Sequence, residues 1–110
     1  MKREIYDEDH EAFRSSVREF LERSVIPNVE QHAADKAIPR EFWLEAGKQG
    51  FLGLEIPEEY GGAGAEDYRF NAVMAEELSK VNAALGSCWG IHADITAPYI
   101  VAMGTEEQKQ

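Results

Sequence analysis

The chain has 110 residues, a hydrophobic content of 44% and a formal net charge of −10 at pH 7. This length suits one domain with a core of its own, and the acidic balance disfavours nucleic acid or an anionic membrane as a partner. A single cysteine, Cys88, excludes an internal disulfide and is typical of a reducing compartment. No signal peptide pattern follows the N-terminus. The least charged stretch, 83–104, contains Asp94 and Pro98, which a membrane span tolerates poorly.

Two helices are predicted in the first half of the chain. The first begins among the acidic residues 7–11, which suit the positive end of a helix dipole, and Pro27 is expected to kink or restart it before it ends near Asp35. Its apolar stripe has helical spacing and consists of Phe13, Val17, Phe20, Leu21 and Val25. The second helix is expected to open at Pro39 and to end at Gly50.

A glycine- and proline-rich connector over 51–66 follows the second helix. Its cluster Gly61-Gly62-Ala63-Gly64 invites interpretation as a phosphate-binding loop. Carboxylates flank the cluster on both sides, at Glu58, Glu59, Glu66 and Asp67, and they would repel a phosphate. The favoured interpretation is a sharp irregular turn, in which glycine permits positive φ angles.

The second half of the chain predicts three more helices. The third spans about Asp67–Val81 and is expected to leave Glu76, Glu77 and Lys80 mostly solvated. The fourth covers about Ala83–Ala93 and is apolar nearly all round, which indicates burial on several sides. Pro98 is expected to separate it from a short fifth helix over 99–103. The sequence therefore predicts an all-α, up-and-down bundle of about five helices.

Clusters that would carry chemistry are weak in this chain. His10 and His32 are expected to be solvated, and no pair of histidines has the spacing of metal ligands. Cys88 has no basic neighbour in the sequence and is expected to be a buried, inert thiol. Near the end, Thr105 and Gln108 form a capping box, the signal for a new helix. The chain is therefore expected to be a piece of a longer protein, the alternative being a frayed terminus.

Taken in order, several short motifs resemble the N-terminal helical domain of the acyl-CoA dehydrogenase family, which includes the acyl-CoA oxidases. The resemblance covers about 9–109, and each motif alone is weak. The motifs are Phe20-Leu21 with Pro27, Pro39 with Trp43, Gly50-Phe51-Leu52-Gly53, Ile56-Pro57-Glu58-Glu59-Tyr60-Gly61-Gly62-Ala63-Gly64, Glu76-Glu77-Leu78, and Gly104-Thr105-Glu106-Glu107-Gln108-Lys109. We therefore assign residues 1–110 as a domain similar to the N-terminal domain of this family.

The resemblance implies an FAD enzyme that forms a 2,3 double bond in an acyl-CoA thioester. In the family a glutamate removes the α-proton, the flavin takes the β-hydride, and electrons pass to an electron-transferring flavoprotein or, in the oxidases, to oxygen. The flavin motifs and the catalytic glutamate of the family belong to a middle β-domain and a C-terminal helical domain. No residue here inherits a catalytic role, FAD is expected to be bound mainly by those other domains, and the isolated chain is expected to be inactive.

The resemblance also implies acyl-CoA as the substrate, a homo-oligomer, and a location in the cytoplasm or, in a eukaryote, the mitochondrial matrix. In the family the helix matching 83–95 lines the pocket for the acyl chain, so the candidate substrate-binding residues are Leu85, Cys88, Ile91, His92 and Ile95. The alternative is that these residues simply pack the domain, and packing is the favoured role of Trp89. An apolar wall is what an alkyl chain requires.

Two other interpretations stay open at the level of sequence. One is a stand-alone helical interaction module that kept the sequence without the chemistry. The other is a fragment of an acyl-CoA oxidase. Flavin motifs in a continuing natural chain would exclude the interaction module.

Overall fold

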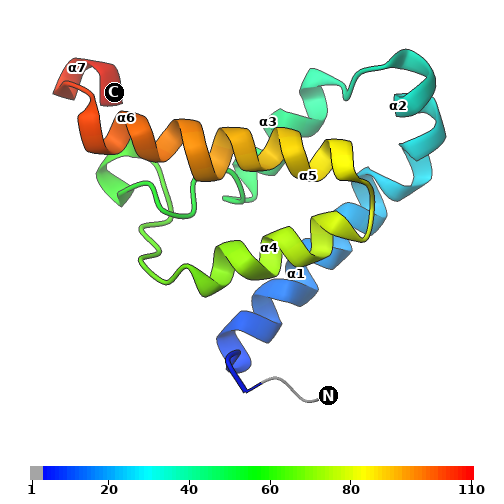
Figure 1. Cartoon of the computed structure of the whole chain (residues 1–110), viewed down its shortest axis with the longest axis horizontal. Coiled ribbons are helices and arrows are strands. Elements are labelled where there is room, and N and C mark those ends of the chain that lie inside the picture. The colour runs from blue at the N-terminus through cyan, green and yellow to red at the C-terminus, as the bar shows by residue number, and fades with distance from the viewer. Residues whose placement is uncertain (1–3) are drawn as a thin grey trace.

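The computed structural model describes residues 4–110, and every regular element within them is helical (Figure 1). The first three residues, part of the stretch searched for a signal peptide, lie outside the described range. The α-helices are α1 (Glu8–Ser24), α2 (Val29–Asp35), α3 (Arg40–Lys48), α4 (Arg69–Ser79), α5 (Ala83–Gly90), α6 (Ala97–Met103) and α7 (Glu106–Lys109). Two 3₁₀ turns, η1 (Ile26–Asn28) and η2 (Glu58–Tyr60), and a π-helical segment, η3 (Ile91–Thr96), join them. The predicted all-α fold class is confirmed.

Helix α1 begins where the acidic residues of the sequence predict. Asp7 is its N-cap, and the Asp7 carboxylate accepts hydrogen bonds from the backbone N–H groups of Asp9 and His10. The helix ends at Ser24, and Pro27 lies in η1, which turns the chain into α2. Pro27 therefore restarts the helix, because proline fits a first turn but not a helix interior.

The core lies between α1, α3, α4 and α5 and is rich in aromatic rings. Phe20 stacks on Phe42 with ring centroids 5.5 Å apart, and Phe51 meets Phe20 edge-on at 5.4 Å. Trp89 is 2% exposed and packs against Phe42 and Trp43 from the other side. The packing interpretation of Trp89 thus agrees with its position in the structure.

The connector is a tight turn whose backbone bonds to itself. The N–H groups of Ala63, Gly64 and Ala65 donate to the carbonyls of Gly53, Ile56 and Leu54, respectively. A Cβ on Gly62 would lie 2.0 Å from the Ile56 carbonyl oxygen, so only glycine permits this approach. The turn returns the chain so that α4 lies beside α1.

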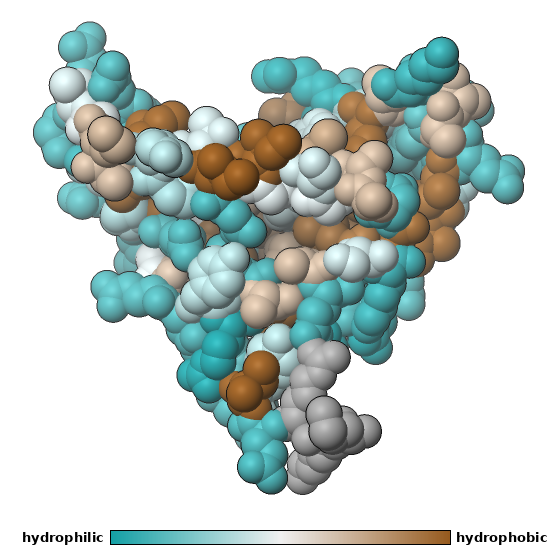
Figure 2. Space-filling model, viewed as in Figure 1, coloured by the Kyte–Doolittle hydropathy of each residue, from teal (hydrophilic) through white to brown (hydrophobic). Residues whose placement is uncertain are grey.

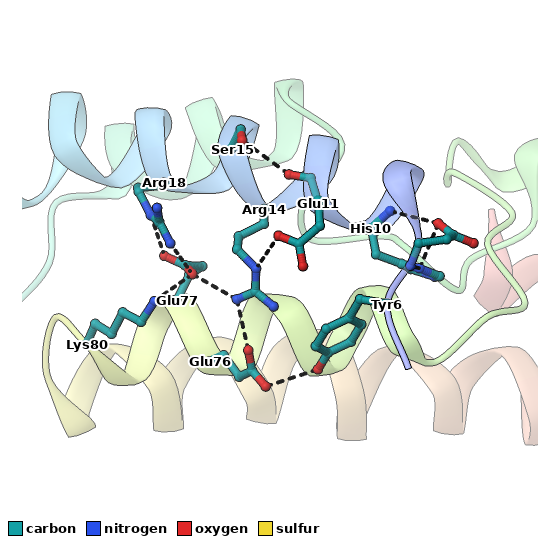
Figure 3. Close-up of polar contacts among 10 residues, drawn as sticks. Tyr6, His10, Glu11, Arg14, Ser15, Arg18, Glu76, Glu77 and Lys80 are labelled. Carbon is teal, nitrogen blue, oxygen red and sulfur yellow. Dashed lines mark hydrogen bonds and ion pairs between the residues drawn. The ribbon is translucent and has the colours of Figure 1, made fainter. Parts of the chain in front are cut away.

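Helices α1 and α4 run in the same direction, joined by a row of polar contacts. Near the start of α1, His10 Nε2 lies 2.7 Å from Asp67 Oδ2; further along, Arg14 and Arg18 both bind Glu77 near the end of α4 (Figure 3). The two helices therefore form a parallel pair within the bundle.

Two sequence predictions for residues in this row of polar contacts are wrong. His10 was expected to be solvated, but it is 1% exposed, with its ring 4.6 Å from Phe70. Asp7 donates its backbone N–H to His10 Nδ1 at 3.0 Å, so the second nitrogen of the ring faces Asp67. Glu77 was expected to be solvated and is 3% exposed. His32, which carried the same expectation as His10, is half-buried. For His10 and Glu77, the cause is contacts with residues that are distant in the sequence.

A single helical rod runs from Ala83 to Met103 across the top of the view in Figure 1. The prediction that Pro98 separates two helices is wrong, because the chain stays helical through it. The reason is η3, in which the Ala97 N–H donates to the His92 carbonyl five residues earlier. The wider π turn relieves the clash that a proline ring makes with the carbonyl four residues before it, here that of Asp94.

The rod is buried on one side only, which also differs from the sequence prediction. Leu85 and Trp89 face the core, while Ile91 and Ile95 are exposed. Cys88 is exposed as well, so the prediction that its thiol is buried is wrong. Helix α5 was expected to be buried on several sides because it is apolar nearly all round. Its second apolar side is open in this chain. In the described part of the chain, no helix is both long enough and apolar enough to cross a membrane.

Candidate functional site

The exposed side of the rod is the strongest candidate site. Of the predicted substrate-binding residues, Cys88, Ile91, His92 and Ile95 are all exposed on it. Ile91 is 54% exposed and Ile95 is 53% exposed, although both are large apolar side chains. Figure 2 shows hydrophobic side chains, in brown, over the middle of this rod, among white and teal ones. Four of the five residues are therefore brought together on one face.

Leu85 lies apart from the other four predicted residues. Its side chain is 0% exposed and belongs to the core. It also lines a hollow of about 450 Å³ behind the start of α5, where Cys88 contributes as well. The other lining residues come from the end of α1, from α2 and from the loop after it; they are Val25, Val29, His32, Ala33, Lys36, Ala37, Ile38, Asn82 and Ala84. Leu85 and Cys88 thus connect the rod to an apolar recess.

The apolar face extends beyond the residues that the sequence singled out. Tyr99 is 65% exposed and Met103 is 77% exposed, and both continue the series on α6. We call Ile91, Ile95, Tyr99 and Met103 the apolar ridge. The sequence does contain a signal for this ridge, because its four residues are spaced four apart. The signal was missed because the expected break at Pro98 divided these residues between two helices.

The π-helical segment determines how straight this ridge is. In an α-helix with about 3.6 residues per turn, each step of four residues overshoots a full turn by about 40°. Three such steps would spread the ridge over about 120° of the helix surface. A π turn holds more residues than an α turn, so a step of four within η3 falls short of a full turn and offsets part of this drift.

One tertiary contact holds the π-helical segment from the side of the core. Asn71, on α4, donates from Nδ2 to Asp94 Oδ1 at 2.8 Å. Asn71 is 3% exposed, and its own Oδ1 has no hydrogen-bond partner in the structure. Asp94 is half-buried between Ile91 and Ile95 in the sequence of η3. The contact is therefore made within the same helical segment as Ile91 and Ile95 of the apolar ridge.

The far end of the rod is joined to the connector. Tyr60 donates its hydroxyl hydrogen to Glu106 Oε2 at 2.5 Å, and this hydrogen bond raises the pKa of Tyr60 to about 12. Helix α7 begins with the predicted capping box, in which Thr105 and Gln108 bond to each other's backbone N–H groups. These contacts fix where α6 ends relative to the turn.

The charges beside the connector disfavour an anionic ligand there. A hollow at this place is lined by Glu58, Glu59 and Glu66, three of the four carboxylates that the sequence pointed to, and by Glu55. Elsewhere, Arg69 forms an ion pair with Asp67, and hydrogen bonds from Arg69 and His10 hold the pKa of Asp67 well below its usual range. Across residues 4–110, no group of three or more metal-ligating side chains is placed to hold a metal ion.

The comparisons with known proteins identify the family of this chain. The sequence profile of the acyl-CoA dehydrogenase N-terminal domain matches residues 7–110. The chain belongs to the acyl-CoA dehydrogenase family. It forms the N-terminal domain of that family, as the motifs in the sequence implied.

Individual relatives support the assignment to the family. The chain is 42% identical over 106 residues to the long-chain specific acyl-CoA dehydrogenase, mitochondrial, of Rattus norvegicus, covering 96% of this chain and 24% of the relative. A crystal structure of acyl-CoA dehydrogenase from Geobacillus kaustophilus superposes with a TM-score of 0.92 at 41% identity, covering 99% of this chain and 28% of that one. An acyl-CoA dehydrogenase from Bacillus anthracis, complexed with FAD, gives a TM-score of 0.82 at 33% identity over 99% of this chain and 18% of that one. The chain thus spans about a quarter of the length of its relatives.

Proposed function

We propose that this domain forms one wall of the acyl-chain pocket of a flavin-dependent acyl-CoA dehydrogenase, which introduces a 2,3 double bond into an acyl-CoA thioester. The observation that carries the proposal is the exposed apolar ridge on α5, η3 and α6 in a chain of this family. An exposed row of large apolar side chains is unfavourable in water unless a partner or ligand covers it.

In this proposal the ridge residues Ile91 and Ile95 contact the alkyl chain of the substrate. Cys88 and His92 flank them, and Leu85 closes the recess behind α5. None of these side chains is assigned to the chemical step. They select the acyl group by shape, because an apolar pocket discriminates between chains through the volume that it leaves open.

The FAD cofactor is proposed to be held mainly by parts of the protein outside these residues. The diphosphate of FAD is anionic and requires positive potential or free N–H groups. The hollow beside the glycine-rich connector carries four glutamates instead, and Arg14, Arg18 and Lys80 are all bound to Glu77. Neither of these two places therefore fits the charged part of the cofactor, and FAD would supply the redox chemistry from other parts of the protein.

The wider assignments rest on membership in the family. We propose an electron-transferring flavoprotein as the electron acceptor, a homo-oligomer as the assembly, and the cytoplasm or a mitochondrial matrix as the location. An acyl-CoA oxidase would use oxygen as the acceptor, and measuring electron transfer to each acceptor distinguishes the two enzymes.

The substitution Ile91→Ala in the full-length protein that carries this domain tests the proposal. Removing this side chain enlarges the pocket, so we expect the ratio of kcat/KM values for a longer and a shorter acyl-CoA to shift by about 10-fold. Turnover on the best substrate should change less, because Ile91 touches only the alkyl chain. The measurement is a series of straight-chain acyl-CoA substrates assayed with one electron acceptor.

Ile26→Ala provides a matched control. Ile26 is 53% exposed, nearly the same as Ile91, but lies in η1 and belongs neither to the apolar ridge nor to the residues that line the recess. This control should leave the relative rates unchanged. Equal relative rates for the wild type and the Ile91→Ala variant would remove the ridge from the pocket and refute the proposal.

A further inference from the structure

Asn71 is an unusual residue for the inner face of α4. Its neighbours in the core of this helix, Val73, Met74 and Leu78, are apolar and nearly fully buried. A buried amide with one unpartnered oxygen costs free energy, whereas an apolar side chain of the same size would pack without that cost. Its single side-chain hydrogen bond goes to Asp94. Core stability is therefore a poor explanation for this amide.

The contact is made at the one place where the rod departs from α-helical geometry. Asp94 lies inside η3, and the π-type hydrogen bond from Ala97 to His92 spans it. Pro98 favours the wider turn locally, because an α-helical turn would press its ring against the Asp94 carbonyl. Asn71 anchors the same residue from a second helix, 23 positions away in the sequence.

The consequence appears on the exposed face of the rod. Ile91 and Ile95 lie on either side of Asp94 along the chain and point outward, so the turn that holds Asp94 also determines the angle between them. If η3 relaxed to an α-helix, one residue fewer per turn would rotate Ile91 and Cys88 relative to Tyr99 and Met103 by about 100°. The straight apolar ridge would then be broken. Single-turn π segments of this kind occur frequently at functional sites.

We propose that Asn71 and Asp94 form a positioning pair that fixes the π-helical turn and thereby determines which acyl lengths fit against Ile91 and Ile95. Neither residue touches the ligand, so both act through the ridge. The inference rests on the proposed function of the ridge as a wall of the acyl pocket. It adds a specificity determinant on α4, a helix that contributes no side chain to the ridge.

The test uses the full-length protein with Asn71→Leu, which keeps the branched shape of the side chain but cannot donate to Asp94. We expect the ratio of kcat/KM values for a longer and a shorter acyl-CoA to shift by about 10-fold, as for a changed pocket wall. In a crystal structure of the variant, the Ala97 N–H should move from the His92 carbonyl to that of Ala93. Asp94→Asn keeps a carbonyl oxygen that can accept from Asn71, and it should retain the parental ratio.

Asn28→Leu is the matched control, since it makes the same substitution in η1, at a residue outside both the apolar ridge and the lining of the recess. Should Asn71→Leu fail to give folded protein, Asp94→Leu breaks the same contact at a half-buried position and is judged by the same two measurements. The inference is overturned if folded Asn71→Leu or Asp94→Leu protein keeps the parental substrate ratio, or if its π turn is intact.

The result also separates this inference from the function on which it rests. If Ile91→Ala shifts the substrate ratio and Asn71→Leu does not, the positioning pair is refuted and the acyl pocket stands. If neither variant shifts it, the pocket assignment itself fails. A shift with Asn71→Leu alone would place the pocket elsewhere and refute both.

Discussion

Replacing Glu77 by glutamine should make the free energy of unfolding of this domain depend less on pH in the acid range. Glu77 is 3% exposed and lies within 2.9 to 3.0 Å of nitrogen atoms of Arg14, Arg18 and Lys80 (Figure 3). Burial by itself would raise the pKa of the Glu77 carboxyl, but hydrogen bonds from Arg18, Lys80 and Arg14 outweigh it and lower the pKa from 4.5 to about 2. The ionised carboxylate is therefore favoured by the folded state.

The size and the sign of the effect follow from that pKa. A difference of 2.5 between the unfolded and folded values corresponds to about 3 kcal/mol of folding free energy. Because the folded pKa is the lower one, this contribution is complete above pH 4.5 and is lost as the pH falls towards 2. The glutamine variant should lose about 3 kcal/mol at neutral pH, near the lower end for a broken buried pair. Arg14 keeps Glu11 and Glu76 as partners, which limits the loss.

Urea unfolding of residues 1–110, followed by far-UV circular dichroism, measures this difference. The gap in unfolding free energy between the wild type and the E77Q variant should be largest at neutral pH and should close near about pH 2. Glu19→Gln, at an exposed position on α1, provides a control that should show almost no gap at any pH. If the difference in unfolding free energy between the wild type and E77Q were the same at neutral and acid pH, the electrostatic explanation would be refuted. Such a difference would have to come from packing.

Two further predictions concern the connector and the open face. Gly62→Ala should destabilise the domain severely, because the new Cβ would lie 2.0 Å from the Ile56 carbonyl oxygen. Gly86→Ala in α5 is the contrasting case, because its new Cβ would have no neighbouring atom within 4 Å, and it should stabilise the domain by about 0.5–1 kcal/mol. Thermal melts of both variants check this, and equal melting temperatures would show that the turn can adjust. The isolated chain should bind a hydrophobic dye or self-associate through the apolar ridge, and dye binding should fall in a variant with Ile91→Ser and Ile95→Ser. A monomeric chain without dye binding would count against an exposed ridge.

Most of the helical pattern could be predicted from the sequence because its causes are local. Acidic residues and Asp7 start α1, Pro27 restarts the chain, and Thr105 with Gln108 starts α7. Each of these signals acts within one helical turn, so it is the same in an isolated segment as in the folded domain. The order of the short motifs was also enough to indicate the family, which the profile match over residues 7–110 confirms.

The errors have a common physical origin. His10 and Glu77 look like surface residues in their own helices, but their partners Asp67 and Arg14 lie 57 and 63 residues away. Pro98 looks like a helix breaker, yet the chain continues through it because η3 widens the turn and Asn71 supports it from α4. A polar side chain that is costly to bury alone becomes favourable when folding supplies its partner.

The sequence by itself determined that this chain is helical, where most of its helices begin, and the family to which it belongs, because capping, periodicity and motif order depend on residues close together in the chain. Only the tertiary structure decided which side of the α5–α6 rod is left open, that η3 links its apolar residues into one ridge, and that His10 and Glu77 are buried. Those properties depend on the parallel approach of α1 and α4 and on the contact between α4 and η3. Such contacts join residues that no local pattern relates.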